Sequence, residues 1–351
     1  MNTQASNTES LQRNQSGMVS IMVTMILMIV MSLIVVGFAQ VSRRNQRVAL
    51  DRQLSTQAFY AAESGVNDAR EFLKGVADPS LVPAKTGCTD NVGGYYASLP
   101  NRTLSSGVTY SCLLINPTPT VLQYNNIGEQ GTVVPLISAT GAAINTITLE
   151  YQAKNASNTP TANCPTTIKN QFKPSANWNC EYGVLRFDLV DVSGNKDANG
   201  YQAATMTSFV VPIKSGSTTA SFSPGNNTLI GTACTDTSCK LTINSGLGGT
   251  QYYMRVSSLY KESTMNISAA GPGGNVKLAN AQVIIDATGK AQDVLRRIQV
   301  HMPLSGLTSN NQLPDNAIQT TDSICKRFSI MDGWVDNTPD GVGGTNSLCT
   351  P

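Results

Sequence analysis

The chain has 351 residues, a formal net charge of +2 and only 13% charged residues. This near-neutral balance argues against a nucleic-acid partner, which requires a concentrated basic surface. The single histidine excludes a His-rich metal site and leaves few groups for acid–base catalysis near neutral pH.

The first predicted element is an apolar helix near the N-terminus. No charged residue occurs from Asn14 to Ser42, and Met18–Ala39 is almost entirely apolar. As a helix, Met18–Ala39 is about 33 Å long, enough to cross a hydrocarbon core of about 30 Å. A membrane-spanning segment is therefore expected at about residues 18–39. Gly37-Phe38-Ala39 also offers a small-x-small cleavage site, so secretion after signal-peptide removal is the alternative.

The helix is expected to continue as an amphipathic segment. Small and apolar residues recur there at steps of three and four: Leu50, Leu54, Ala58, Ala61, Gly65, Ala69 and Phe72. The first proline is Pro79, and Gly75 followed by Asp78-Pro79 makes a natural stop. The pattern predicts one helix over residues 18–75. Its second half needs a sheet or neighbouring subunits to cover its apolar stripe.

The charges flanking the apolar segment and the cysteines point to opposite orientations. Arg13 precedes the segment and four arginines follow it, so a positive-inside count places the C-terminal side in the cytoplasm. All eight cysteines follow the segment, as expected for an exported domain. Long domains translocate largely regardless of charge, so the head is expected to be extracytoplasmic.

The cysteines suggest disulfides rather than metal sites. None of them forms a C-x-x-C pair, which disfavours zinc ribbons and thioredoxin-like redox sites. Eight cysteines allow many connectivities, and eight free thiols remain an alternative. Pairing of sequence neighbours is the simplest hypothesis: Cys88–Cys112, Cys164–Cys180, Cys234–Cys239 and Cys325–Cys349.

Residues 79–351 are expected to form a β-rich head without a further long helix. Turn-forming Gly, Asn, Ser, Thr and Pro clusters separate the candidate strands. A division into two lobes is hypothesised, with its break near residues 215–227. The candidate strands are Thr109–Ile115, Thr146–Gln152, Gly183–Val192, Thr205–Ile213, Tyr252–Tyr260 and Met265–Ala269, followed by a hairpin over residues 281–300.

No catalytic constellation can be assembled from the sequence, and a non-enzymatic protein is expected. His301 is interpreted as a hydrogen-bonded structural residue of a strand, and no P-loop or H-E-x-x-H motif occurs.

Two oxygen-rich segments are weak calcium candidates, although ordinary turns contain the same residue types. The first matches half of an EF-hand loop, but Met206 replaces its bidentate glutamate. No cofactor is expected, with calcium left open. The candidate ligands are Asn195, Asp197, Asn199, Asp336 and Asp340.

The N-terminal residues resemble a type IV prepilin. A polar leader (residues 1–17) ends in Gly17-Met18, and an unbroken apolar helix follows. The resemblance implies that a prepilin peptidase cleaves after Gly17 and that Met18 becomes the mature, usually methylated, N-terminus. Met22 stands where the family carries a glutamate, which favours a minor or tip subunit over an ordinary major pilin.

The segment Phe59–Gly65 makes the resemblance more specific. Its sequence, FYAAESG, is similar to the FYAAEAG segment of PilX-type minor pilins. An ATG…RR hairpin over residues 287–297 is a weaker similarity. The residues assigned to the assembly helix are Met22, Phe59, Tyr60, Ala61, Ala62, Glu63 and Gly65.

The resemblance implies a minor subunit of a type IV pilus or related filament, with the tip as its candidate position. Its helix would lie in the cytoplasmic membrane before assembly and in the filament core afterwards, with the head at the cell surface. The implied partners are the membrane, other pilin subunits, the prepilin peptidase and a host or surface ligand. A disulfide-bounded loop at 326–348 would serve adhesion or assembly. A secreted β-domain adhesin unrelated to pili and a type II secretion pseudopilin are the alternatives.

Overall fold

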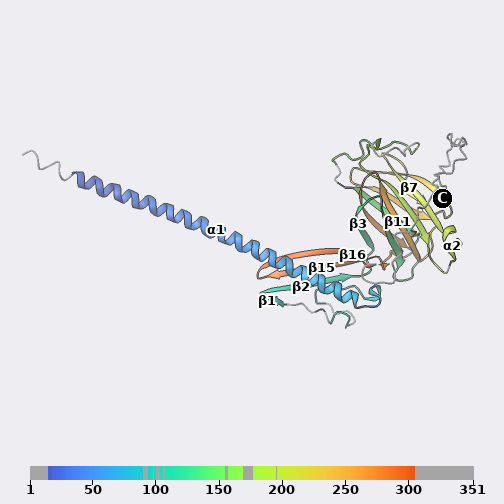
Figure 1. Cartoon of the computed structure of the whole chain (residues 1–351), viewed down its shortest axis with the longest axis horizontal. Helices are drawn as coiled ribbons and strands as arrows, with labels where there is room; N and C mark the ends of the chain where they lie inside the picture. Colours follow the sequence, from blue (N-terminus) through green and yellow to red (C-terminus); the bar gives the residue numbers. More distant parts are fainter. Residues whose placement is uncertain are drawn as a thin grey trace, which may run out of the picture.

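The computed structural model describes residues 15–89, 94–97, 99, 103–105, 107–154, 157–168, 177–194 and 196–304. Figure 1 shows a long helix, a small sheet against its C-terminal half, and a larger β body beyond that sheet. The predicted α+β class is confirmed: a long N-terminal helix is followed by a disulfide-stapled, β-rich head.

Helix α1 runs without interruption from Gln15 to Lys74, over 60 residues. It is about 90 Å long and joins the apolar and amphipathic segments in one rod. Gly17 and Met18 lie in its first turn, and leader residues 1–14 lie outside the described residues. The helix ends where the sequence predicted. The Gly75 amide donates to the Glu71 carbonyl at 3.2 Å, and a 3₁₀ turn follows at Pro79–Leu81.

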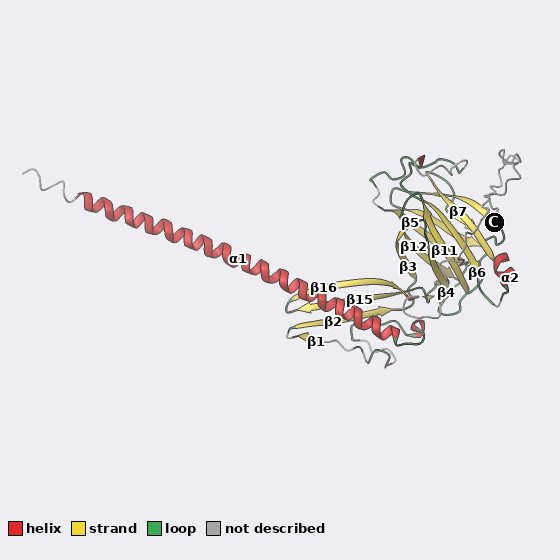
Figure 2. Cartoon of the chain, in the orientation of Figure 1, coloured by secondary structure: helices red, strands yellow, loops and turns green. Residues whose placement is uncertain are grey.

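A four-stranded antiparallel sheet, here called the docking sheet, packs against the C-terminal half of α1 (Figure 2). Its order is β1-β2-β15-β16, so it joins strands from both ends of the head. Their bounds are β1 Thr103–Ser105, β2 Val108–Asn116, β15 Gln282–Ala291 and β16 Val294–Pro303.

The rest of the described head is a sandwich of two six-stranded sheets. The first contains β3 Val121–Ile127, β5 Thr146–Ala153, β8 Thr219–Ser221, β10 Cys239–Ser245, β12 Ser263–Gly271 and β13 Gly274–Asn275. The second contains β4 Thr132–Ser138, β6 Val184–Asp191, β7 Thr205–Ile213, β9 Asn227–Ala233, β11 Gln251–Leu259 and β14 Leu278–Ala279. A short helix, α2 (Ala198–Ala203), joins β6 to β7.

Alternating side chains fill the space between the two sandwich sheets. In β6, Leu185, Phe187 and Leu189 are completely buried, as the alternating pattern of that strand indicates. Residues of both sheets belong to one continuous apolar core. This core is separate from the apolar core that the docking sheet shares with the helix.

The candidate strands correspond to strands of the structure, but the sequence pattern did not predict several others. β3, β4 and β9 carry residues that are rare in strands: Asn125 and Asn126, Pro135 and Gly231. The hairpin turn was also misplaced. Gly289 lies inside β15, and the chain turns at Gln292 and Asp293 instead.

The suggested lobe break near residues 215–227 is wrong, because this segment belongs to the sandwich. β8 pairs with β10, and the buried Phe222 ring lies 5.8 Å from the Tyr252 ring. The segment resembles a linker only because turn residues gather at the sandwich edge. Two separate apolar cores instead place the boundary where the chain leaves and re-enters the docking sheet, at residues 117–120 and 280–281.

Three disulfides lie within the described residues, and they join the cysteines that neighbour-pairing predicts: Cys88–Cys112, Cys164–Cys180 and Cys234–Cys239. The expected Cys325–Cys349 pair lies outside the described residues. Cys164–Cys180 closes a loop with a sequence separation of 16, whereas Cys234–Cys239 has a separation of only 5.

Loop length predicts how much each disulfide stabilises the sandwich. By the chain-entropy relation, C164S/C180S should lower the free energy of unfolding by about 3 kcal/mol, and C234S/C239S by about 2 kcal/mol. Thermal and denaturant unfolding of the detergent-solubilised chain measure both losses. A larger loss from C234S/C239S would contradict this assignment.

Candidate assembly surface on the N-terminal helix

One face of α1 is built from small residues and lies directly against β15. Ala58, Ala61, Ala62 and Ala69 on this face are completely buried. Small side chains allow two backbones to approach closely, and glycine within a strand often marks such an approach. The part of the predicted stripe from Ala58 onward is therefore the surface that holds the helix to the head, whereas Leu50 is 57% exposed and lies outside this contact.

Two glycines form the closest part of this contact. A Cβ atom added to Gly289 would collide with the Ala58 carbonyl and the Ala62 amide of the helix backbone. A Cβ added to Gly65 would lie 3.2 Å from Cγ of Tyr110. The helix and the sheet therefore meet with no side chain between them at Gly289.

Apolar and polar contacts fix the position of the helix along the sheet. Leu73 is buried in one apolar core with Leu113 and Ile285 of the docking sheet. The Tyr110 hydroxyl donates to Asp68 at 2.9 Å, and Nε of Arg296 donates to the Ser55 hydroxyl at 2.8 Å. Sliding by one turn would break both hydrogen bonds.

The opposite face of the FYAAESG segment is open. Phe59 and Tyr60 are 47% and 60% exposed, and their rings meet edge to face with centroids 5.9 Å apart. Glu63 is also exposed. The sequence motif thus combines two surfaces: Ala61, Ala62 and Gly65 face the sheet, and Phe59, Tyr60 and Glu63 face outward.

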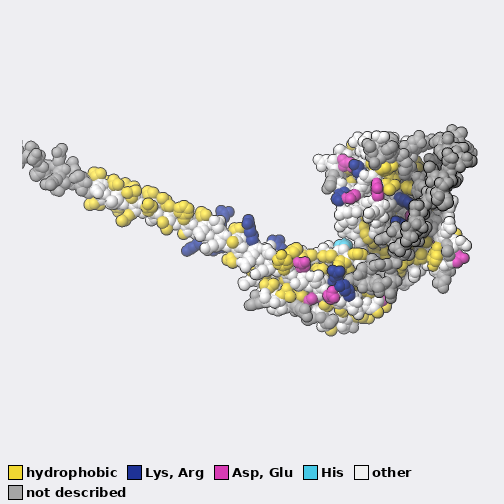
Figure 3. Space-filling view, in the orientation of Figure 1, with side chains coloured by type: hydrophobic (Ala, Val, Ile, Leu, Met, Phe, Trp, Pro, Cys, Tyr) yellow, Lys and Arg dark blue, Asp and Glu magenta, His cyan; other side chains and the backbone are white. Residues whose placement is uncertain are grey.

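The apolar half of α1 makes no buried contact with the described residues of the head. Its side chains, Met22 among them at 68% exposed, lie open along the projecting rod (Figure 3). The hydroxyls of Thr24 and Ser32 donate to the carbonyls of Ile21 and Ile29, three residues earlier. Such bonds satisfy polar groups within an apolar environment. By length and composition this helix can cross a membrane.

The β15–β16 hairpin carries its two arginines on opposite faces. Arg296 reaches the helix, whereas Arg297 binds the buried carboxylate of Asp286 from the other side, with Nε 2.7 Å from Oδ1. The hydrogen bond and the charge of Asp286 raise the pKa of the Arg297 guanidinium. The RR pair therefore braces the hairpin from both sides.

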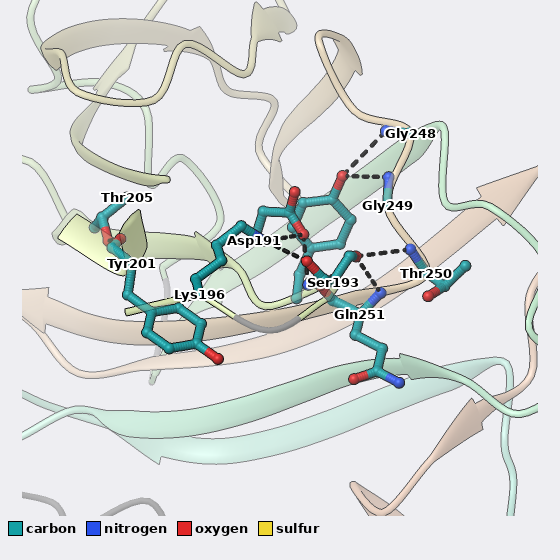
Figure 4. A network of polar contacts seen from close by, with 10 residues as sticks. Asp191, Ser193, Lys196, Tyr201, Thr205, Gly248, Gly249, Thr250 and Gln251 are labelled. Carbon is teal, nitrogen blue, oxygen red and sulfur yellow. Dashed lines mark hydrogen bonds and ion pairs between the residues drawn. The ribbon is translucent and has the colours of Figure 1, made fainter. Parts of the chain in front are cut away.

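Residues beside the first calcium candidate form an internal polar network, in which Ser193 and Lys196 both contact the Asp191 carboxylate (Figure 4). The Asp197 carboxylate caps α2 by accepting from the Gly200 amide at 2.7 Å, and Asn199 is exposed on the same helix. The ammonium of Lys196 lies 3.8 Å from the Asp191 carboxylate, so a positive charge already stands beside this segment. Among the described residues, no three His, Cys, Asp or Glu side chains gather as a metal site. Asn195, Asp336 and Asp340 lie outside those residues.

His301 differs from its expected hydrogen-bonded role. Within the described part of the chain, its Nδ1 is buried without a hydrogen-bond partner. Desolvation lowers the pKa of the imidazole from its ordinary value. Because its pKa is lowered in the folded chain, His301 makes the stability of the docking sheet depend on pH.

We expect Gly289→Ala to separate α1 from the docking sheet. Because the added Cβ would collide with the helix backbone, the whole helix must move to remove the clash. The free energy of unfolding should therefore fall by about 1–3 kcal/mol or more. Gly273→Ala is the matched control, since a Cβ there has nothing within 4 Å. Equal unfolding midpoints for the two variants would refute the backbone contact.

Removing the imidazole should flatten the pH dependence of stability. The folded-state pKa of His301 lies below the unfolded value of about 6.5, so the unfolded chain binds more protons and stability falls as pH drops through that region. Unfolding midpoints between about pH 8 and pH 5 should therefore fall more steeply for the natural chain than for His301→Gln. Parallel curves would show an unshifted histidine.

Comparison with known proteins supports the N-terminal interpretation. The family model described as PilX N-terminal matches residues 16–67, which cover the apolar half of α1 and the FYAAESG segment. No curated protein matches the chain. No solved structure matches it either.

Proposed function

Since α1 is the N-terminal helix of a PilX-type type IV pilin, we propose that this chain is a minor subunit placed at or near the tip of its filament. In this proposal, α1 anchors the unassembled subunit in the cytoplasmic membrane with the head outside. After assembly the same helix lies in the filament core. The filament is a type IV pilus or a related one.

The exposed apolar half of α1 is the observation that carries the proposal. Large side chains such as Met28 (76% exposed) and Phe38 (73% exposed) surround the rod on all sides. Burying each in lipid or protein is worth roughly 1.5–3 kcal/mol. Lipid before assembly and neighbouring helices after assembly both supply that environment.

The outward face of the FYAAESG segment supports contact with other subunits. Phe59 and Tyr60 offer an aromatic pair above the membrane-spanning part of the helix, and Glu63 adds a charge beside them. Aromatic side chains are enriched at protein interfaces. We therefore assign these three residues to packing between helices of adjacent subunits.

Met22 supports the tip position. In an assembling pilin, a carboxylate at this place pairs with the N-terminal amine of the preceding subunit, within apolar surroundings where an unpaired charge is costly. Met22 lacks that carboxylate. A subunit without the carboxylate suits the first position, where no preceding amine has to be neutralised.

The sandwich supports a recognition role for the head. It lies at the end of the docking sheet away from the projecting helix (Figure 1). In a filament with α1 at its core, the sandwich would face outward and present its loops to a surface ligand. We propose binding rather than catalysis as the work of this domain.

Processing at Gly17 is directly measurable. The chain isolated from membranes or sheared filaments should begin at Met18, with an added methyl group, by intact mass and N-terminal sequencing. A chain beginning at Gln40 would instead indicate signal-peptide cleavage and a secreted protein. An intact Met1 would also contradict prepilin processing.

Position in the filament tests the tip assignment separately. Gold-labelled antibody against the sandwich should mark filament ends, and deletion of the chain should reduce the number of filaments rather than their length. Regular labelling along the shaft would disprove the tip role while leaving the pilin assignment intact.

A further inference from the structure

A group of arginines occupies the free stretch of α1 between the apolar half and the docking sheet. Arg43, Arg44 and Arg47 are all exposed there. Figure 3 shows dark blue side chains gathered on this part of the rod. Asp51 is the only acidic residue between Gln15 and Ala62 in the sequence. The positive charge of this stretch is therefore largely uncompensated by its own helix.

These arginines share the side of the helix that docks on the sheet. Successive residues turn by about 100°, so Arg43, Arg44 and Arg47 lie within about 80° of the mean direction of the buried small residues. Further along the helix, Ala58 and Ala62 lie on the docked side. The three arginines thus project into the space between the apolar half and the head.

The tip of the β15–β16 hairpin borders the same space. In Figure 1 the hairpin runs back along α1 toward its apolar half. The Arg296–Ser55 hydrogen bond places this tip beside the helix, and Lys290 and Arg296 are exposed. Leu295 is 58% exposed at the same tip. Basic and apolar side chains together are typical of a surface that lies on a membrane interface.

We propose that the helix arginines and the hairpin tip form one collar that binds the headgroups of anionic phospholipids. The collar consists of Arg43, Arg44, Arg47, Lys290, Leu295 and Arg296. The proposal rests on the proposed function only in that α1 must be inserted in a membrane. The helix arginines bind lipid phosphates, and the hairpin tip rests on the same leaflet.

The spacing along the helix fits this arrangement. Arg43 to Ser55 spans about 18 Å, of which the headgroup layer of one leaflet fills about 5–8 Å. The arginines then lie among the phosphates. The turn at Gln292 and Asp293 extends about 10 Å beyond Arg296 toward the apolar half, so the hairpin tip reaches down to the same layer (Figure 1). The collar has five basic residues against the nearby Asp51 and Asp293, whereas the entire chain has a net charge of only +2.

The collar would set the depth and tilt of the unassembled subunit. Each basic residue near an anionic surface favours the bound state by roughly fivefold, and the effects of the three helix arginines combine. Withdrawal of the subunit into a filament must break these contacts. The collar therefore retains the subunit in an anionic membrane until assembly removes it.

The experiment uses the full chain in nanodiscs of phosphatidylcholine alone or with added phosphatidylglycerol. Hydrogen–deuterium exchange is followed in peptides covering residues 43–55 and 288–298. Phosphatidylglycerol should slow exchange in both segments by about tenfold, and high salt should reverse the effect. R43Q/R44Q/R47Q should abolish it, and Leu295→Glu should abolish it at the hairpin.

Arg70→Gln is the matched control, because Arg70 is an exposed arginine of α1 beyond the collar. This variant should keep the full lipid effect. Equal exchange in both lipids, or slowing in the helix alone, would overturn the collar. If slow exchange requires two chains per disc and does not require phosphatidylglycerol, the collar binds a second copy of the chain and not lipid, which also overturns the proposal. Exchange in residues 19–42 reports insertion of α1, and free exchange there would refute the membrane anchor itself.

Discussion

The contact between the backbone of α1 and that of β15 is the constraint on which the rest of the structure depends. At Gly289 no side chain separates the helix from the strand, and the alanines at positions 58 and 62 leave the helix backbone accessible to it. This contact sets the direction in which the rod leaves the head. It also places the RR hairpin beside the helix, with one arginine on each face of the sheet.

The same helix meets two environments because its uniformly apolar part, which ends near Ala39, and its buried small-residue stripe, which begins at Ala58, are separate segments of one rod. The docked half buries a narrow face and leaves Phe59 and Tyr60 free. The other half is apolar and exposed on every side, a surface suited to lipid or to neighbouring helices. A continuous backbone couples the two, so any contact that positions the apolar half in a membrane or filament also positions the sandwich.

The sequence predicted α1 well because helix periodicity, the absence of proline before Pro79 and the Gly75 stop are local signals. The assembly-helix residues were proposed from the resemblance. Their division into inward and outward sets was not predicted, because the motif alone does not say which face a sheet covers. Gly289 was taken for a turn residue, since a glycine needed for close backbone contact has the same sequence signal. The two cores were also missed, because the docking sheet joins strands separated by more than 160 residues.

Photo-crosslinking from single positions on α1 in intact filaments tests the central claim most directly. Probes replacing Met28 and Tyr60 should crosslink to other subunits, and a probe replacing Ala69 on the docked face should react only within its own chain. Crosslinks from Ala69 to other subunits, together with none from Met28, would contradict the account.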